Sequence, residues 1–71
     1  MNIESLDLSK YDFVEIVYAR TDVVMHAYSL RHNTPQEIKE RLLKLESGLK
    51  IESTRELTYG DSTTLVVSIV I

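Results

Sequence analysis

The pattern of apolar and polar residues predicts two β-hairpins with a helix between them. Residues 11–19 and 23–30 are rich in β-branched and aromatic side chains, as strands usually are, and a turn separates them. Residues 50–58 and 63–71 form a second pair of strands around a turn at residues 59–62. The first ten residues alternate only loosely. We therefore expect one domain over residues 1–71, made of an extended arm (1–10), a hairpin (11–30), a helix (35–47) and a hairpin (50–71).

The helix has the clearest local signals in the chain. Thr34 is a good N-cap, Pro35 suits the first helical position, and Glu37 stands where a capping-box carboxylate reaches back. Gly48 favours the end of the helix. Apolar residues at spacings of four, three and four place one stripe along the helix, formed by Ile38, Leu42, Leu45 and Leu49.

This order of elements, ββαββ, predicts a two-layer α+β domain in which one helix covers one face of a four-stranded mixed or antiparallel sheet. The third strand is the most polar and is expected at a sheet edge. The first and last strands are the most apolar and are expected in the middle. The predicted strand order is 2-1-4-3 with a parallel central pair, and a swapped order is the main alternative.

The register of the first hairpin follows from the chemistry of its two faces, because a slip of one residue inverts every side chain. A two-residue loop at Arg20 and Thr21 directs one apolar face toward the helix. The reverse face then pairs Val17 with Val24, Glu15 with His26 and Phe13 with Tyr28. A three-residue loop is chemically poorer, since it sets Glu15 opposite Ala27 and His26 opposite Ile16.

In the second hairpin, a three-residue loop at residues 60–62 sets Leu57 opposite Leu65 and Ile51 opposite Ile71. The expected core residues of the last strand are Leu65, Val67, Ile69 and Ile71. The reverse face is expected to carry Lys50, Glu52, Thr54, Glu56 and Thr58 beside Val66, Ser68 and Val70.

The helix can cover only one face of the sheet, so the other is a candidate protein interface. Large apolar patches on monomers usually mark interaction sites. Three occupants are open at this point: the arm, with Ile3, Leu6 and Leu8 as a lid; a second copy of the chain; or a different protein. The predicted interface residues are Phe13, Glu15, Val17, Val24, His26, Tyr28, Leu30, Val66 and Val70.

Charge and composition limit the classes of partner that we expect. The net charge is −3, and the acidic excess lies within the first 22 residues, while the basic residues are interleaved with acids. A nucleic-acid binder usually has a clustered basic surface, so we expect no nucleic-acid partner. No apolar run approaches the ~20 residues of a membrane span, and no signal segment is evident. Cysteine is absent, which excludes disulfides and thiolate sites and fits a cytoplasmic location.

Candidate chemistry is sparse. Glu15 beside His26 is the one pair with acid–base potential, and it is better explained as a structural cross-strand pair. No nucleophile is evident, and no metal-binding motif occurs, so we expect no catalytic residue, no metal and no cofactor. Arg31 precedes the helix N-terminus, where free amides attract anions, and Arg31 and His26 are the candidate ligand-binding residues.

These observations favour a small cytoplasmic protein-interaction domain of the regulator or inhibitor type. It would do no chemistry and would form a homodimer through the uncovered sheet face. The alternative is a small-molecule or anion-binding domain with an inter-subunit site that uses Glu15, His26, Tyr28 and Arg31. Because the chain ends within an apolar strand, we expect either that a partner covers this end or that the chain is one domain of a longer protein.

Overall fold

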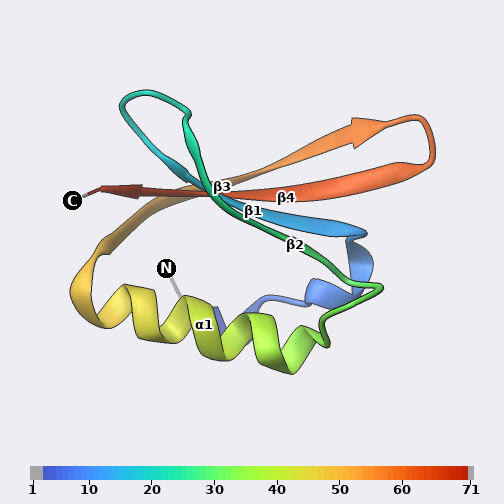
Figure 1. Cartoon of the computed structure of the whole chain (residues 1–71), viewed down its shortest axis with the longest axis horizontal. Helices are drawn as coiled ribbons and strands as arrows, with labels where there is room; N and C mark the ends of the chain where they lie inside the picture. The colour runs from blue at the N-terminus through green and yellow to red at the C-terminus, as the bar shows by residue number, and fades with distance from the viewer. Residues whose placement is uncertain (1–2, 71) are drawn as a thin grey trace.

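The computed structural model describes residues 3–70 and has two layers, a four-stranded sheet and a layer that contains the helix (Figure 1). The strand order is β2-β1-β4-β3, with β1 parallel to β4 and both outer pairs antiparallel. The predicted α+β class and strand order are therefore confirmed. Two short 3₁₀ helices come first, η1 (Ile3–Ser5) and η2 (Leu8–Lys10). They are followed by the strands β1 (Phe13–Tyr18) and β2 (Val24–Ser29), the helix α1 (Pro35–Gly48), and the strands β3 (Lys50–Tyr59) and β4 (Ser62–Val70).

Helix α1 begins at the predicted cap. The Thr34 hydroxyl Oγ1 accepts a hydrogen bond from the Glu37 backbone N–H at 3.2 Å, which satisfies one of the free amides of the first turn. Ile38 and Leu42 are fully buried against the sheet. The helix therefore presents the predicted apolar stripe to the sheet, while Leu43 is exposed on its outer side.

The N-terminal arm winds into two 3₁₀ turns and lies beside α1 (Figure 1). Ile3 and Leu8 are each buried in the same core that α1 covers. The expected extended conformation of the arm is therefore wrong, and its described part does not form the lid on the uncovered face that was one of the three alternatives. The physical reason is the width of the sheet. A helix about 10 Å across is narrower than four strands that lie about 4.8 Å apart, so α1 alone leaves part of the core uncovered, and Ile3 and Leu8 of the arm fill that part.

The first hairpin contains a β-bulge that the sequence pattern does not reveal. Val17 pairs with Val24 as predicted, but the register then shifts around Met25, and Ile16 pairs with His26. The predicted pairs Glu15–His26 and Phe13–Tyr28 are therefore wrong. Beyond the bulge the partners are Glu15 with Ala27, Val14 with Tyr28 and Phe13 with Ser29.

Two features accompany this register. The loop is longer than predicted and is closed by the Asp22 N–H, which donates to the Tyr18 carbonyl at 2.8 Å, with Asp22 at a positive φ of 56°. The bulge turns Tyr28 and Leu30 from the predicted outward face to the helix side, and three apolar side chains of the second strand are then partly buried against the core. These side chains are Met25, Tyr28 and Leu30.

The second hairpin turns on two residues, Gly60 and Asp61, because Tyr59 pairs with Ser62. Gly60 has a φ of 58°, and a two-residue hairpin loop that follows the strand twist needs a positive φ at its first position. The predicted three-residue loop is wrong. Leu57 lies opposite Thr64, and a second bulge precedes Ser53.

The shorter loop sorts the side chains of β3 differently from the prediction. Leu65, Val67 and Ile69 line the core as expected, while Ile71 lies outside the described residues. Ser53, Arg55 and Leu57 pair with the residues of β4 that face away from α1, namely Ser68, Val66 and Thr64. Strand alternation places Thr54, Glu56 and Thr58 on the helix side, so the prediction that they face outward is wrong. Lys50 lies on the predicted face, opposite Val70, although the predicted register did not pair these two residues.

Candidate protein-interaction site

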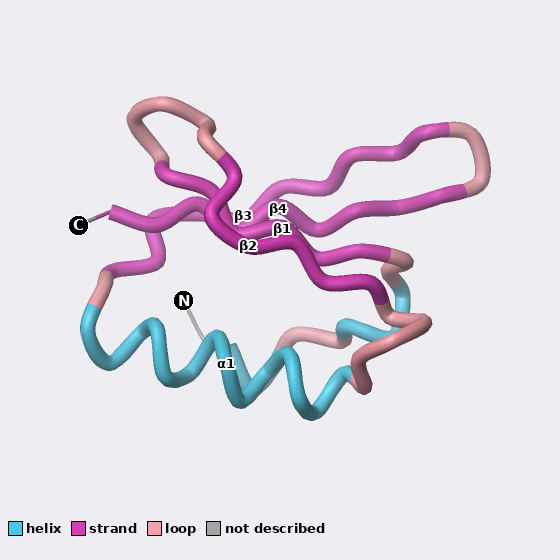
Figure 2. Tube along the Cα trace, viewed as in Figure 1, coloured by secondary structure: helices cyan, strands magenta, loops and turns pink. Residues whose placement is uncertain are grey.

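The open face is the sheet surface that faces away from α1. The loops of both hairpins lie on this side of the sheet (Figure 2). The predicted interface residues that lie on it are Phe13, Glu15, Val17, Val24, Val66 and Val70. The structure does not place His26, Tyr28 and Leu30 there, because the bulge turns them to the helix side.

Further residues belong to the open face although the sequence pattern did not place them there. Ser29 lies beside Phe13, and Ser53 lies beside Ser68. Ala27 lies beside Glu15, Arg55 lies beside Val66, and Leu57 lies beside Thr64. A two-residue loop at Gly60 and Asp61 would have placed Arg55 and Leu57 correctly, so a glycine at the first loop position was the available signal.

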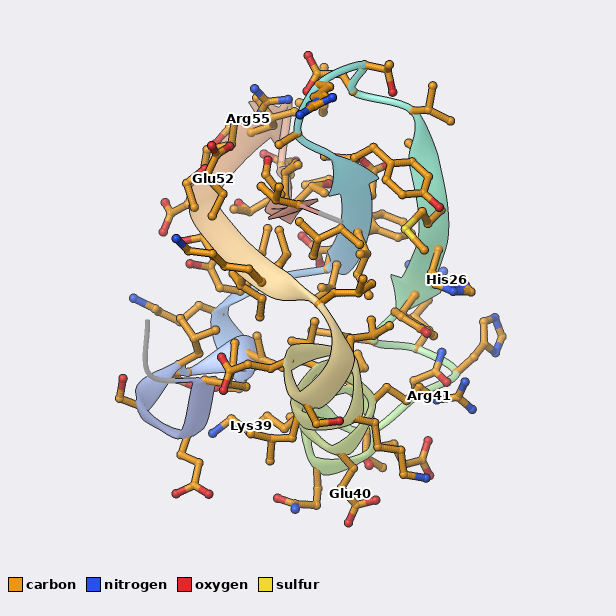
Figure 3. All side chains as sticks on the ribbon, turned by 90° about the vertical axis from the view of Figure 1, so that its left-hand side faces the viewer. His26, Lys39, Glu40, Arg41, Glu52 and Arg55 are labelled. Atoms are coloured by element: carbon orange, nitrogen blue, oxygen red, sulfur yellow. The ribbon has the colours of Figure 1, made fainter. Side chains whose placement is uncertain are left out.

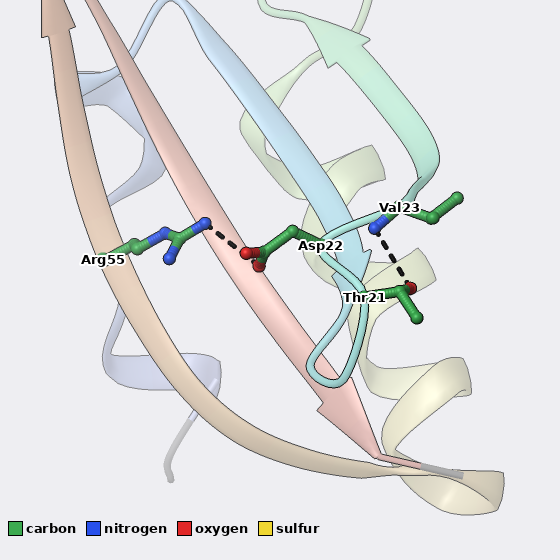
Figure 4. A network of polar contacts seen from close by, with 4 residues as sticks. All are labelled: Thr21, Asp22, Val23 and Arg55. Atoms are coloured by element: carbon green, nitrogen blue, oxygen red, sulfur yellow. Dashed lines mark hydrogen bonds and ion pairs between the residues drawn. The ribbon is translucent and has the colours of Figure 1, made fainter.

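An ion pair crosses the open face (Figure 4). Nη2 of Arg55 on β3 lies 3.3 Å from Oδ1 of Asp22 in the β1–β2 loop, in front of β4. On the same face Val17 and Val66 are only 2% and 1% exposed, although no helix in the described residues covers this side. The centre of the open face is therefore not an accessible apolar patch, and exposed apolar side chains lie instead toward its margins.

Strand β2 forms one of these margins. Val23 and Val24 are 56% and 47% exposed, and His26 and Ala27 are exposed further along the strand. Residues 23–30 contain no aspartate, glutamate, lysine or arginine. The opposite margin is β3, which carries Lys50, Glu52, Arg55 and Glu56.

The backbone direction along β2 follows from the hydrogen bonds at its two ends. The Tyr18 N–H donates to the Val23 carbonyl, and the Leu30 N–H donates to the Asp12 carbonyl. Because backbone groups alternate along a strand, His26 and Tyr28 direct their N–H and C=O groups toward β1. Ala27 therefore directs its N–H and C=O outward, where the described residues provide no neighbouring strand.

A short aromatic stack lies on the helix side of β2. The rings of His26 and Tyr28 are stacked with centroids 6.1 Å apart, and the Arg41 guanidinium carbon lies 5.4 Å from the centre of the Tyr28 ring. Figure 3 shows His26 and Arg41 on one flank of the molecule and Glu52 and Arg55 on the other. This stack connects the helix to the β2 edge by a cation–π contact.

The candidate ligand-binding pair His26 and Arg31 is not brought together around one cavity. Arg31 lies on a hollow of about 580 Å³ that His32 and Asp12 also line, and His26 is not among its lining residues. The Asp12 carboxylate in this hollow accepts a hydrogen bond from the Thr63 N–H at 2.9 Å. Glu15, on the open face, does not reach the hollow either.

The clearest electrostatic perturbation lies on the β3 side, away from β2. The Tyr11 hydroxyl donates a hydrogen bond to Oε1 of Glu56 at 2.6 Å. This hydrogen bond, with burial and the negative charge of Glu56, raises the pKa of Tyr11 to about 12. The contact ties the end of the arm to β3 and points to structure rather than catalysis.

Within residues 3–70, no cluster of three or more histidine, aspartate or glutamate side chains is arranged to hold a metal ion. No helix in this part of the chain has the length and hydrophobicity needed to cross a membrane. Comparison with known proteins gives no match to a family model, to a curated protein or to a solved structure.

Proposed function

We propose that this chain is a small protein-interaction domain that does no chemistry and binds an uncharged, extended segment of a partner along the β2 edge. The observation that carries this proposal is the difference between the two sheet edges. Edge strands present unpaired backbone groups to solvent, and proteins usually protect them with charged side chains. Strand β3 has that protection, whereas β2 has no charged side chain along it.

In strand addition, an extended segment of the partner pairs with an edge strand, and this identifies the groups of β2 that would bind it. The outward N–H and C=O of Ala27 would supply backbone hydrogen bonds, and neighbouring side chains would select the incoming residues. Val24 supplies an exposed apolar contact on the open face, and His26 supplies an aromatic contact on the helix side. A partner with an uncharged strand fits this edge because no side chain along β2 would offset a buried charge.

The placement of Glu15 and His26 is compatible with the proposed non-enzymatic role. Glu15 and His26 lie on opposite faces of the sheet, so the pair that had catalytic potential in the sequence does not form. We propose that the chain is a regulator or inhibitor that acts by binding a partner's extended segment and so keeping that segment from other contacts. A cytoplasmic location is part of the proposal, on the ground that the chain has no cysteine.

A strand-forming peptide tests the proposal. The probe is an N-acetylated, C-amidated hexapeptide of alternating valine and threonine. The ¹⁵N-labelled chain is held at low micromolar concentration, and the peptide is titrated up to millimolar concentration. Saturable amide shifts are expected at Ala27 and Ser29 and not along β3. The result that overturns the proposal is an absence of shifts at millimolar peptide, or shifts confined to the open face around Phe13 and Arg55.

Two substitutions at one position make this test specific. Ala27→Pro removes only an outward N–H, so the β1–β2 hydrogen bonds remain and peptide binding is lost. Ala27→Val keeps the N–H and is the matched control, for which binding within about threefold of wild type is expected. Equal binding by both variants would exclude strand addition at this edge.

A further inference from the structure

We propose that the strand added to β2 is β2 of a second copy of this chain, antiparallel, with the two-fold axis at Ala27. The inference rests on the proposed function above, because it names the occupant of the same edge. The product is a continuous eight-stranded sheet with both α1 helices on one side.

Charge distinguishes β2 from the rest of the surface. The chain carries a net charge of −3, so two copies repel each other over much of their surfaces. The repulsion is weakest where neither copy has a charged side chain, and along the two sheet edges this condition holds only for β2. An edge-to-edge contact at β2 also keeps the Asp22–Arg55 pair of each copy outside the seam.

The backbone and side chains of β2 are complementary to their own two-fold image. Ala27 directs both backbone groups outward, so a register that sets Ala27 opposite Ala27 forms a pair of hydrogen bonds at the axis. The same register sets His26 opposite Tyr28 of the second copy, and no pair of like charges results.

This register extends a contact that exists within one chain. His26 is already stacked on Tyr28 with an interplanar angle of 22°, and Arg41 lies over the same tyrosine. Two copies bring together four rings on the helix side of the seam. Aromatic cross-strand pairs are among the stabilising contacts of antiparallel sheets, so the stack favours a second copy over an arbitrary strand.

The contact is small, because β2 has only six residues and its first part is distorted by the bulge. Interfaces of this size belong to weak, reversible associations. We therefore expect a mass that rises from 8.2 kDa toward twice that value as the concentration increases from micromolar to millimolar.

The absence of cysteine allows a clean cross-linking test, since each variant then has one thiol. Ala27→Cys places two sulfurs at the axis, where the Cα separation of a paired position suits a disulfide. Ser29→Cys lies off the axis on the same strand, and Thr58→Cys lies on the opposite edge; both are matched controls. With oxidised glutathione, Ala27→Cys is expected to form a covalent dimer at least tenfold faster than either control.

Light scattering on wild type, Ala27→Val and Ala27→Pro completes the test. The first two are expected to associate and the third to stay at 8.2 kDa. A dimer that cross-links faster at Ser29→Cys or Thr58→Cys overturns the proposed register. A chain that stays monomeric at millimolar concentration overturns the proposal that the added strand belongs to a second copy. If the valine–threonine peptide still binds at Ala27 in that case, the proposed function remains without the further inference. Failure of both experiments overturns both proposals.

Discussion

Asp22 and Arg55 lie 33 positions apart in the sequence and meet in front of β4, where their side chains join the β1–β2 loop to the opposite edge strand. The Nη2–Oδ1 distance of 3.3 Å marks an ion pair, and both side chains are more than half exposed. The pair therefore connects the two hairpins on the face that α1 leaves uncovered.

The first prediction concerns the strength of this pair. Asp22→Asn removes the charge and keeps a residue that tolerates the positive φ of this position. Because the pair is exposed, we expect the free energy of unfolding to fall by at most about 1 kcal/mol, and the loss to shrink at high salt. Urea unfolding with Asp61→Asn as the control measures this. A loss above about 2 kcal/mol would show that Asp22 has a further structural role.

The second prediction concerns pH and Tyr11. The folded-state pKa of Tyr11 is raised from 10 to about 12, so its contribution to stability is complete below pH 10 and disappears as the pH rises through 12. Tyr11→Phe is expected to cost about 0.5–1.5 kcal/mol at neutral pH, the typical value of one hydrogen bond. The variant should also lose less stability than wild type between pH 10 and 12.

Tyr59 provides the control for that experiment, because it is 68% exposed. Tyr59→Phe is expected to leave the free energy of unfolding within about 0.5 kcal/mol of wild type. If Tyr11→Phe and wild type show the same alkaline profile, the hydrogen bond to Glu56 does not hold the arm.

The third prediction tests whether the arm is part of the core. Leu8 is 1% exposed and Leu43 is 36% exposed, so the same substitution at the two positions should differ strongly. Leu8→Ala is expected to lower the free energy of unfolding by about 2–5 kcal/mol, and Leu43→Ala by less than about 0.5 kcal/mol. Leu8→Met, which conserves volume and should cost less than about 1.5 kcal/mol, serves if the alanine variant does not fold. Equal effects at Leu8 and Leu43 would contradict the arm's placement.

The fourth prediction separates the observed register from the one expected from the sequence. A double-mutant cycle on Arg41 and Tyr28 should give a coupling energy of about 0.5–1 kcal/mol, because the guanidinium lies over the ring. A cycle on Glu15 and His26 should give less than about 0.3 kcal/mol, since these side chains lie on opposite faces. The reverse pattern would favour the unbulged hairpin.

The parts of the fold that sequence could predict are those set by local chemistry. The cap at Thr34 and the stripe through Ile38 and Leu42 identify the helix without any knowledge of its neighbours. The polar composition of β3 identifies an edge, and the apolar composition of β4 identifies a central strand. Strand order followed from these two facts.

Register and the course of the arm depended on tertiary packing. The bulge at Met25 is stabilised because Tyr28 and Leu30 pack, partly buried, against the core, and alternation along the strand does not encode this packing. The arm turns toward the helix side because the core beside α1 needs Ile3 and Leu8. As a result the predicted Glu15–His26 site disappeared, and the ion pair between Asp22 and Arg55 had no signature in the sequence.

The parallel seam between β1 and β4 has a consequence for folding order. Each residue of β1 pairs with one 51 positions later, from Phe13 with Thr64 to Tyr18 with Ile69. Each hairpin closes a short loop and can form within microseconds, whereas the seam must close a separation of 51 positions in a chain of 71 residues. Native structure should therefore be completed by the docking of two preformed halves, with α1 as the connecting segment, and changes at the seam should slow folding more than changes in either hairpin loop.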